Sequence, residues 1–366
     1  MRVGFDLTSA VKPRPRGISN YIRGLVSVIS SVETDLKPFF FIRDGKWFKR
    51  NLIANLVPEA PRKWLLADRT GVSLDLFHGL DVRLPVHKAN PQIFTLHDLR
   101  VLDSQDWDAQ RWIDIRTRKI RQTLERADGI LFLAQHGLNR FRFHFPDFPK
   151  EKLGITPLGV QHDVFRPWDS KESAPILLKH NITRPYLLHV SQLSRHKNPE
   201  LSIQAFAESQ ASAAGMLLLF VGGVGQDYHQ ELLSFADKFG VKNQVQWIHQ
   251  LPYEELPAFY SSAEAVLVPS LYEGFGLPLL EAMACGAAGV FAHTTCLPEV
   301  SGKAWPSAPA DDVPAFARNI DRFLIDPHFC RETRAAAIQR ASEFSWERCA
   351  KETLSFHQKI LHCSTS

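Results

Sequence analysis

Cysteines are few in this sequence of 366 residues, and their arrangement disfavours two kinds of site. The five cysteines are odd in number and widely spaced, and no two of them form a Cys-x-x-Cys motif. A disulfide framework requires pairs, and a structural zinc site requires closely spaced ligands. We therefore interpret all five as free thiols.

Long apolar runs are also missing. No stretch approaches the ~18 consecutive apolar residues that a membrane-spanning helix needs. The first ten residues lack the charged region and the small-residue cleavage site of a secretory signal peptide. We therefore expect a cytoplasmic protein.

The net charge is small, because 39 aspartates and glutamates balance most of the 43 lysines and arginines. Basic residues nevertheless gather in two segments, 12–17 and 116–126. A solvated surface or helix face is the commoner explanation of such segments. Contact with an anionic membrane surface or a phosphate-bearing substrate is the alternative.

Length and pattern together predict the fold class. The chain exceeds the ~250 to 300 residues at which a single core stops growing. Short β-rich runs alternate with helix-compatible stretches, which indicates βαβ units and parallel sheets, and this series runs twice. We predict an α/β protein with two doubly wound domains facing each other across a cleft. The expected parts are a first domain at 1–165, a linker at 166–180, a second domain at 181–345, and a closing helix at 346–366 that is able to pack back on the first domain.

The most informative stretch is SLYEGFGLPLLEAMACG, at 270–286. Pro278 suits the first position of a helix, so Gly274 and Gly276 fall in the strand-to-helix turn, where backbone amides can meet an anion. Glu281 is expected in the first turn, where an acid complements the helix dipole by ~0.3 to 1 kcal/mol. That explanation does not cover Glu273, which precedes two glycines in an apolar loop. A nucleoside diphosphate sugar would fit, with amides on its diphosphate and carboxylates on its hydroxyls.

The segment EGFGLPLLEAMACG closely resembles the E-x7-E signature of the family 4 retaining glycosyltransferases with the GT-B fold. The resemblance implies two Rossmann-like domains, with the nucleotide sugar bound by the C-terminal one. It implies that Glu273 is catalytic and holds the sugar hydroxyls. The donor-binding residues that it implies here are Gly274, Phe275, Gly276, Leu277 and Glu281, the last on the ribose.

Two further segments resemble the donor side of this family. In LLHVSQLSRHKNPELSIQAF, Lys197 occupies the place of a lysine that contacts the donor diphosphate, which implies a catalytic and donor-binding role. Ser191 and Gln192 stand where the family usually has Gly-Arg, and Arg195 is the candidate substitute for that arginine. In TCLPEVSGKAWPSAP, the LPEV-G pattern implies donor binding by Glu299, although the usual Gly-Asp-Ala has become Gly-Lys-Ala.

The N-terminal half carries weaker resemblances. In QIFTLHDLRVL, the family's strand ends in His-Asp, which implies a catalytic His97 that orients the transferring sugar and an acceptor-side Asp98. LDLFHGLDVRLP repeats the pattern with His78 in an acceptor-side loop. RPRGISNYIRGL is similar to the turn after the first strand, with Gly17 near the sugar diphosphate and an acceptor-side Tyr21 at the start of the helix. A lone histidine is more often structural, and both readings stay open for the two histidines.

Competing motifs find little support. GGVGQDY lacks the third glycine of a dinucleotide fingerprint, and no GxxxxGK[ST] motif is present. The DWD at 106–108 matches a metal-binding DxD by letter but lies in a polar loop, so we interpret it as chance. Without a carboxylate cage, we expect no metal, no cofactor beyond the nucleotide sugar substrate, and no nucleic-acid partner.

The resemblance implies a retaining hexosyltransferase that moves a sugar from a nucleoside diphosphate sugar to an acceptor hydroxyl. The N-terminal half resembles bacterial mannosyltransferases of lipopolysaccharide, polysaccharide or lipid-linked glycan synthesis, which makes GDP-mannose the expected donor. A lipid-linked acceptor would explain the basic segments through peripheral contact with the inner face of the membrane. The alternatives are a catalytically silent nucleotide-sugar or glycan-binding subunit, and a GT-B phosphorylase or epimerase.

Overall fold

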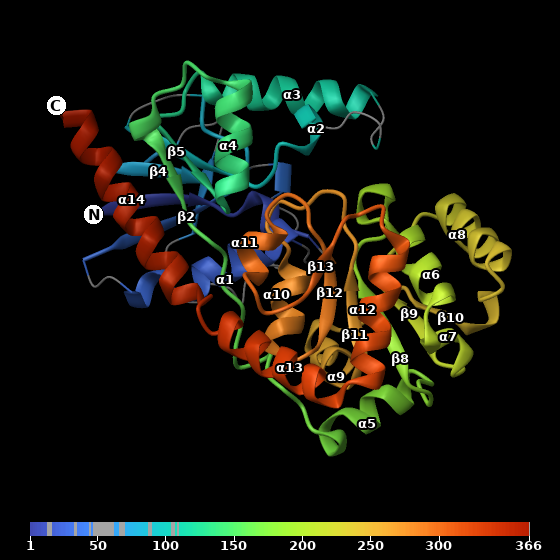
Figure 1. Ribbon diagram of the computed structural model, residues 1–366. Helices are drawn as coiled ribbons and strands as arrows, with labels where there is room; N and C mark the ends of the chain where they lie inside the picture. Colours follow the sequence, from blue (N-terminus) through green and yellow to red (C-terminus); the bar gives the residue numbers. More distant parts are fainter. Residues whose placement is uncertain are drawn as a thin grey trace. The chain divides into compact units, whose positions relative to one another are not determined.

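The computed structural model describes residues 1–12, 17–32, 35–43, 45–46, 62–65, 70–86, 90–103, 107 and 110–365 (Figure 1). The chain forms two compact units. Unit 1 comprises Met1–Gly159 together with Phe344–Ser366, and unit 2 comprises Val160–Glu343. The C-terminal helix thus belongs to the first unit, although 184 residues separate the two parts of that unit in sequence.

Unit 1 contains a seven-stranded sheet in the order β3-β2-β1-β4-β5-β6-β7 among the described residues. Every neighbouring pair is parallel. The order runs outward from β1 in both directions, which is the doubly wound arrangement. The strands are β1 Arg2–Asp6, β2 Lys37–Arg43, β3 Arg62–Leu65, β4 Leu76–Gly79, β5 Gln92–Leu96, β6 Gly129–Phe132 and β7 Leu153–Ile155.

The helices of unit 1 include the C-terminal one. They are α1 Gly17–Val32, α2 Arg100–Asp103, α3 Gln110–Leu124, α4 Gln135–His144 and α14 Trp346–Thr365, with short 3-10 turns η1 Thr8–Ala10 and η3 Lys150–Lys152. Helix α14 packs on α1. The Trp346 ring lies so close to Gly24 that a β-carbon there would overlap it. A glycine in a helix lowers its stability, so its presence here is explained by this close packing.

Unit 2 contains a six-stranded parallel sheet in the order β10-β9-β8-β11-β12-β13. Its strands are β8 Tyr186–Val190, β9 Leu217–Val221, β10 Val245–Ile248, β11 Ala265–Val268, β12 Gly289–Ala292 and β13 Ser307–Ala308. The strands β8, β9, β11 and β12 are almost wholly buried apolar runs, as a parallel sheet covered on both faces requires. Two parallel, doubly wound sheets confirm the predicted fold class.

The helices of unit 2 begin in the stretch that was expected to be a linker. The Asp169 side chain caps α5 by accepting hydrogen bonds from the amides of Lys171 and Glu172, and the Glu172 side chain accepts one from the Asp169 amide. The stretch 166–180 is therefore largely helical. The helices are α5 Ser170–Lys179, α6 Pro199–Glu208, α7 Gln210–Ala213, α8 Gln226–Lys238, α9 Leu256–Ser262, α10 Leu277–Ala284, α11 Leu297–Ser301, α12 Val313–Ile325 and α13 Pro327–Ala341, with 3-10 turns η4 Arg195–Lys197, η5 Lys242–Gln244 and η6 Tyr253–Glu255. No helix in the described part of the chain combines the length and apolarity needed to cross a bilayer.

Candidate active site

Two of the three predicted catalytic residues meet in unit 2. Lys197 lies in the turn after β8, and Glu273 lies in the loop after β11, the strand next to β8 in the sheet. The Lys197 Nζ donates a hydrogen bond to the Glu273 Oε1 over 2.6 Å. Both side chains are mostly buried, with exposed fractions of 15% and 10%. Ligands of doubly wound sheets collect at the carboxyl ends of the strands, which is where this pair lies.

The environment of Glu273 leaves one oxygen available. The Ser270 Oγ donates a second hydrogen bond to the same Oε1, over 2.8 Å. Among the described residues nothing donates to Oε2. A carboxylate held by one oxygen, with the other unengaged, is suited to accept hydrogen bonds from hydroxyl groups of a ligand.

Three loops are fastened to one another around this pair. The backbone N–H of Glu273 donates to the Thr295 Oγ1 over 3.2 Å, and the Cys296 thiol donates to the Glu273 carbonyl. The Leu271 N–H donates to the His196 carbonyl, 2.9 Å away. The loops after β8, β11 and β12 therefore form one connected group. Sequence reasoning missed Ser270 and Thr295, although both follow buried strands.

The turn that follows Glu273 depends on Gly276. Its φ of +94° is in the left-handed region, and a β-carbon there would come within 2.6 Å of the Leu297 side chain. Gly276 caps α10, which begins at Leu277, so Pro278 is the second helical residue and not the first. Phe275 beside it is buried. The amides at this helix start have no partner within the helix, which is the geometry that receives anions.

Glu281 does not lie in the first turn of α10, as the sequence had suggested. The helix starts one residue earlier than expected, and Glu281 lies in its second turn, only 4% exposed. Tyr253 donates to its Oε1 over 3.0 Å and Tyr260 to its Oε2 over 3.4 Å. Burial raises the Glu281 pKa to about 7, against the opposing effect of the two tyrosine hydrogen bonds. The dipole explanation therefore fails, because the first turn contains no acid.

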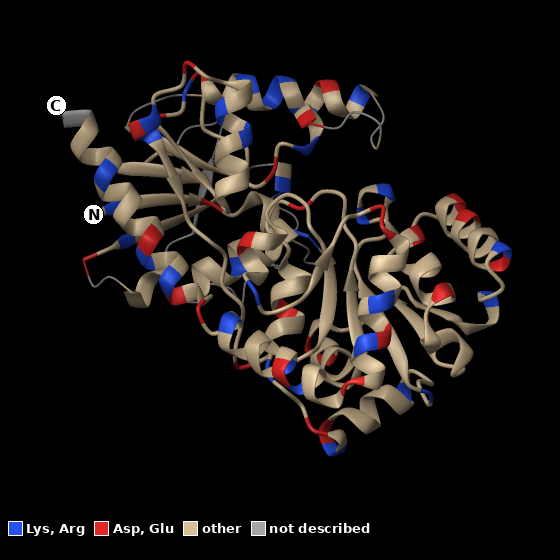
Figure 2. Ribbon diagram, in the orientation of Figure 1, with Lys and Arg blue, Asp and Glu red and all other residues tan. Residues whose placement is uncertain are grey.

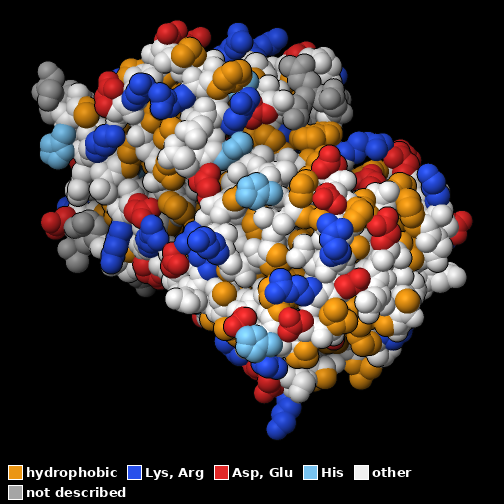
Figure 3. All heavy atoms as spheres, viewed as in Figure 1, with side chains coloured by type: hydrophobic (Ala, Val, Ile, Leu, Met, Phe, Trp, Pro, Cys, Tyr) orange, Lys and Arg blue, Asp and Glu red, His pale blue; other side chains and the backbone are white. Residues whose placement is uncertain are grey.

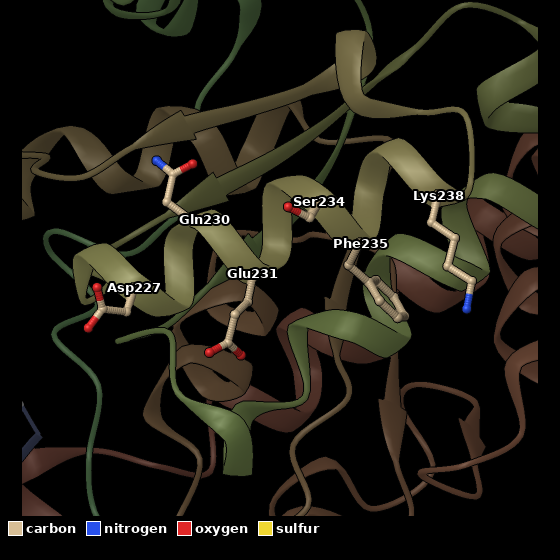
Figure 4. Close-up of a pocket in the computed structure, with 6 residues that line it drawn as sticks. All are labelled: Asp227, Gln230, Glu231, Ser234, Phe235 and Lys238. Carbon is tan, nitrogen blue, oxygen red and sulfur yellow. The ribbon is translucent and has the colours of Figure 1, made fainter.

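Arg195 has partners other than the Lys197–Glu273 pair. Its guanidinium forms an ion pair with Glu231 of α8, at 2.7 Å, and lies 5.1 Å from the centre of the Tyr228 ring. Glu231 also lines a shallow depression along α8, which Figure 4 shows with its lining side chains. None of the predicted site residues lines that depression. Glu299 of α11 has an exposed side chain, and its carbonyl accepts a bond from Arg340.

Ser191, which replaces the family's usual glycine, has a structural partner. The buried His189 bonds the Ser191 Oγ through Nε2 and the Ser202 Oγ through Nδ1, each over 2.9 Å. Burial, with a smaller effect of Lys197, lowers the His189 pKa to about 3, so the ring is neutral. A neutral imidazole provides one donor and one acceptor, which matches two hydroxyl partners. The departure at Ser191 thus anchors the loop that carries Lys197.

In unit 1, His97 follows β5 and is 9% exposed. Its Nε2 donates to the Leu80 carbonyl over 2.9 Å, and its ring meets the edge of Tyr21 with centroids 5.0 Å apart. Burial lowers its pKa, although the Asp81 carboxylate opposes this, so His97 is neutral near pH 7. Asp98 is half-buried and accepts a bond from the Arg100 amide at the start of α2.

His78 and Tyr21 are not where the sequence placed them. His78 lies within β4, fully buried, and bonds the Thr95 Oγ1 over 2.9 Å and His357 of α14 over 3.1 Å. Tyr21 lies in the second turn of α1, 2% exposed, with its hydroxyl 2.9 Å from the same Thr95 Oγ1. The expected acceptor-side loop position of His78 is wrong, because these residues form a polar network inside the core of unit 1.

The remaining predictions fall at the edges of the described residues. Gly17 is exposed at the first position of α1, and a β-carbon there would meet nothing within 4 Å in the described part of the chain. Asp106 and Asp108 of the DWD lie outside the described residues. Among the residues that are described, no group of three or more His, Cys, Asp or Glu is arranged to hold a metal.

Comparison with known proteins identifies a domain in unit 2. Residues 171–344 match the model described as glycosyl transferases group 1. This chain contains a glycosyl transferase group 1 domain. That segment covers most of unit 2, including Lys197, Glu273 and Glu281. Unit 2 therefore contains a glycosyltransferase domain.

Relatives and solved structures agree with this assignment. The O-antigen chain mannosyltransferase B of Escherichia coli is 27% identical over 303 residues, which cover 82% of this chain and 78% of that protein. The serotype-specific mannosyltransferase WbdA of Escherichia coli is 29% identical over 248 residues, and the match spans 66% of this chain but only 30% of that protein. A D-inositol 3-phosphate glycosyltransferase of Segniliparus rotundus is 31% identical over 305 residues, 81% of this chain and 63% of that protein.

Among solved structures, the sucrose-phosphate synthase from Thermosynechococcus elongatus has a TM-score of 0.75 at 19% identity, covering 99% of both chains. The Anabaena protein HepE, in complex with UDP and glucose, has a TM-score of 0.74 at 17% identity, covering 97% of this chain and 99% of that one. At these identities the likeness concerns the fold. It confirms the expected GT-B fold.

Proposed function

We propose that this glycosyltransferase moves mannose from GDP-mannose to a hydroxyl of a growing bacterial surface glycan, with retention of anomeric configuration. The observation that carries the proposal is the Lys197–Glu273 pair at the ends of adjacent strands. The mannosyltransferases among the relatives support mannose as the sugar, and the one that is matched over most of its length is an O-antigen enzyme.

Lys197 is assigned to the leaving group. As the bond from sugar to diphosphate breaks, negative charge grows on the diphosphate and the sugar becomes oxocarbenium-like, as in glycoside hydrolysis. A lysine ammonium is a compact point charge that suits a diphosphate. In the free protein, Glu273 holds this ammonium in place, and two of its three protons stay available for phosphate oxygens. The amides of Gly274–Leu277 add stabilisation by preorganised donors.

Glu273 is assigned to the sugar. Its Oε2 has no donor among the described residues, so it can accept hydrogen bonds from sugar hydroxyls while Oε1 keeps Lys197 and Ser270. No general base is needed from this carboxylate in this mechanism. The leaving phosphate takes the proton of the acceptor hydroxyl in this mechanism, on the same face as the departing group.

Glu281 is assigned to the donor ribose, with Tyr253 as its partner. Its carboxylate oxygens accept one tyrosine hydrogen bond each, and each oxygen has a second lone pair for a ribose hydroxyl. From unit 1, His97 is assigned to a hydroxyl of the transferring sugar. A neutral ring that donates through Nε2 to Leu80 presents Nδ1 as an acceptor.

Peripheral contact with an anionic membrane is a further part of the proposal. Helix α3 exposes about half of Trp112 and of Ile115, and the Arg116 guanidinium lies 5.9 Å from the Trp112 ring. Lysines and arginines lie along the same helix, as Figure 2 shows, and basic side chains gather over this part of unit 1 in Figure 3. Exposed aromatic and cationic residues on one helix favour the interface of anionic lipids.

A thermal-shift panel of nucleoside diphosphates and their sugars tests the donor assignment. A ligand that binds only the folded state raises the unfolding midpoint. We expect GDP and GDP-mannose to raise it more than UDP, ADP and UDP-glucose. A response to none of them would favour a glycan-binding subunit without a nucleotide-sugar donor and would overturn the proposal.

A further inference from the structure

A cavity of about 200 Å³ opens in unit 1, away from the group around Glu273. It lies between the end of β2, the segment after β4, and α3. Among the described residues nine line it, of which four are cations and none is an acid: Arg43, Val82, Arg83, Leu84, Val86, Lys119, Gln122, Thr123 and Arg126. Such a lining is suited to an anion.

Two of the arginines have buried donors without partners. The Nε atoms of Arg83 and Arg126 are shielded from solvent, and no described residue accepts a hydrogen bond from either one. Most buried polar groups in proteins are paired, and an unpaired buried donor costs about 1 to 3 kcal/mol. Both atoms belong to residues that line the cavity, so each of these two guanidinium groups keeps hydrogen-bonding capacity that the described residues do not use.

The lysine of this cavity is crowded by other cations. Burial is the main cause that lowers the Lys119 pKa to about 8, and Arg83, Arg116 and Arg43 lower it further. Asp81 opposes them. Arg43 is fixed by bonds to the Asp6 carboxylate and to the Leu84 carbonyl. An anion in the cavity would relieve the mutual repulsion of these cations.

Asp81 connects the cavity to the residues assigned to the sugar. Its carboxylate interacts electrostatically with both Lys119 and His97. It is itself held by the Val82 amide and the Ser9 hydroxyl, at 2.7 and 2.8 Å. The cavity lies at the carboxyl ends of the parallel strands β2 and β4, and His97 follows the carboxyl end of β5 in the same sheet.

We propose that this cavity binds a phosphate or diphosphate group carried by the acceptor. Guanidinium groups match the oxygens of phosphates with paired N–H donors, and a volume of about 200 Å³ suits such a group more than a whole nucleotide sugar. Val86, 56% exposed at the cavity, offers an apolar surface for what the phosphate carries. The assignment to the acceptor rests on the proposed function, whereas binding of the anion does not.

The test uses inorganic diphosphate and calorimetric titration of the full chain. Because Lys197 is assigned to a diphosphate as well, the titrations are made in the Lys197→Ala background. We expect Arg83→Gln together with Arg126→Gln to weaken diphosphate binding at least tenfold. Arg118→Gln, on the exposed part of α3 and outside the cavity lining, serves as the matched control and leaves binding unchanged.

A second variant guards against misfolding of the double mutant. Val86→Glu adds a negative charge at an exposed position without changing the core, and we expect it to abolish diphosphate binding. Diphosphate binding that both cavity variants leave intact, or the absence of any binding in the Lys197→Ala protein, would overturn the proposal. When the cavity substitutions are placed in the wild-type chain, which keeps Lys197, we expect the GDP thermal shift to stay unchanged. Failure of the donor assignment is thereby distinguished from failure of the cavity proposal.

Vesicles distinguish the source of the phosphate. Phosphatidylcholine vesicles that contain phosphatidic acid present a phosphate monoester on a lipid, and phosphatidylcholine vesicles without it are the control. If the cavity variants lose both diphosphate binding and the sedimentation that depends on phosphatidic acid, the cavity binds the phosphate of a lipid-borne acceptor. If they lose diphosphate binding alone, the phosphate belongs to a free acceptor.

Discussion

The ammonium of Lys197 and the carboxylate of Glu273 are joined by a hydrogen bond of 2.6 Å, although 76 positions separate them in sequence. They meet because β8 and β11 are neighbours in a parallel sheet, so the loops after these strands emerge side by side. The pair is mostly buried and is supported by Ser270 and by the loop after β12. A preorganised cation beside an available carboxylate oxygen is what departure of a diphosphate from a sugar requires.

Glu281 is expected to make unit 2 less stable at alkaline pH. Its pKa in the folded protein, about 7, is above the ordinary value of 4.5, so its protonated form favours the folded state. That contribution is complete below pH 4.5 and is lost as the pH rises to about 7, by up to roughly 3 kcal/mol. Denaturant unfolding at pH 5 and pH 8 measures it. Glu281→Gln should remove most of this difference, and an equal decline in the variant would contradict the assignment.

Gly276→Ala should disturb the turn that leads into α10. The positive φ and the close Leu297 side chain both oppose a β-carbon, so we expect a loss of about 1 to 3 kcal/mol in the free energy of unfolding, together with weaker nucleotide binding. Gly225→Ala is the matched control, since Gly225 caps α8 with a φ of −67° and open space around it. Equal stability of the two variants would contradict this account of the turn.

The two histidines of unit 1 that were predicted as site residues, His78 and His97, should differ in the effects of their replacement. His78→Ala leaves Thr95 and His357 without their partner in the core, so we expect it to cost about 2 to 4 kcal/mol of stability and to leave the rate per folded molecule near normal. His97→Ala should lower that rate by at least tenfold. Denaturant unfolding and initial rates below the unfolding midpoint measure the two quantities. A large rate loss in the folded His78 variant would restore it as a site residue.

Helix α3 should govern binding to anionic vesicles. Trp112→Ser together with Ile115→Ser removes two half-exposed apolar side chains, and we expect about tenfold weaker sedimentation with vesicles that contain phosphatidylglycerol. The control replaces Ile325 and Ile338 by serine, because these are exposed apolar residues of unit 2. If the control loses as much binding as the α3 variant, the membrane assignment is wrong.

The fold was accessible from the sequence because parallel strands buried on both faces are continuous apolar runs. The strands β8, β9 and β11 are such runs, and each is followed by a helix-compatible stretch. Glu273 and Lys197 could be predicted as site residues for a related reason, since loops that follow such strands contain the ligand-binding residues. The hydrogen bond between them could not be predicted, because it depends on the strand order in the sheet.

The errors have physical causes as well. A histidine inside the central strand β4 looks like the end of a strand, since its partners Thr95 and His357 are distant in sequence. Glu281 was misplaced because Gly276, in a left-handed conformation, starts α10 one residue before Pro278. The structural role of Ser191 could not be read from the sequence, because it depends on the buried ring of His189.

The most direct test of the account is the rate of mannose transfer by Lys197→Ala, measured as release of GDP that depends on an added acceptor. The protein must remain folded, with an unfolding midpoint near that of the wild type. We predict that the rate falls by about 10²-fold or more, because the variant loses the charge that stabilises the leaving diphosphate. A folded Lys197→Ala protein that transfers mannose at a nearly normal rate would contradict the account.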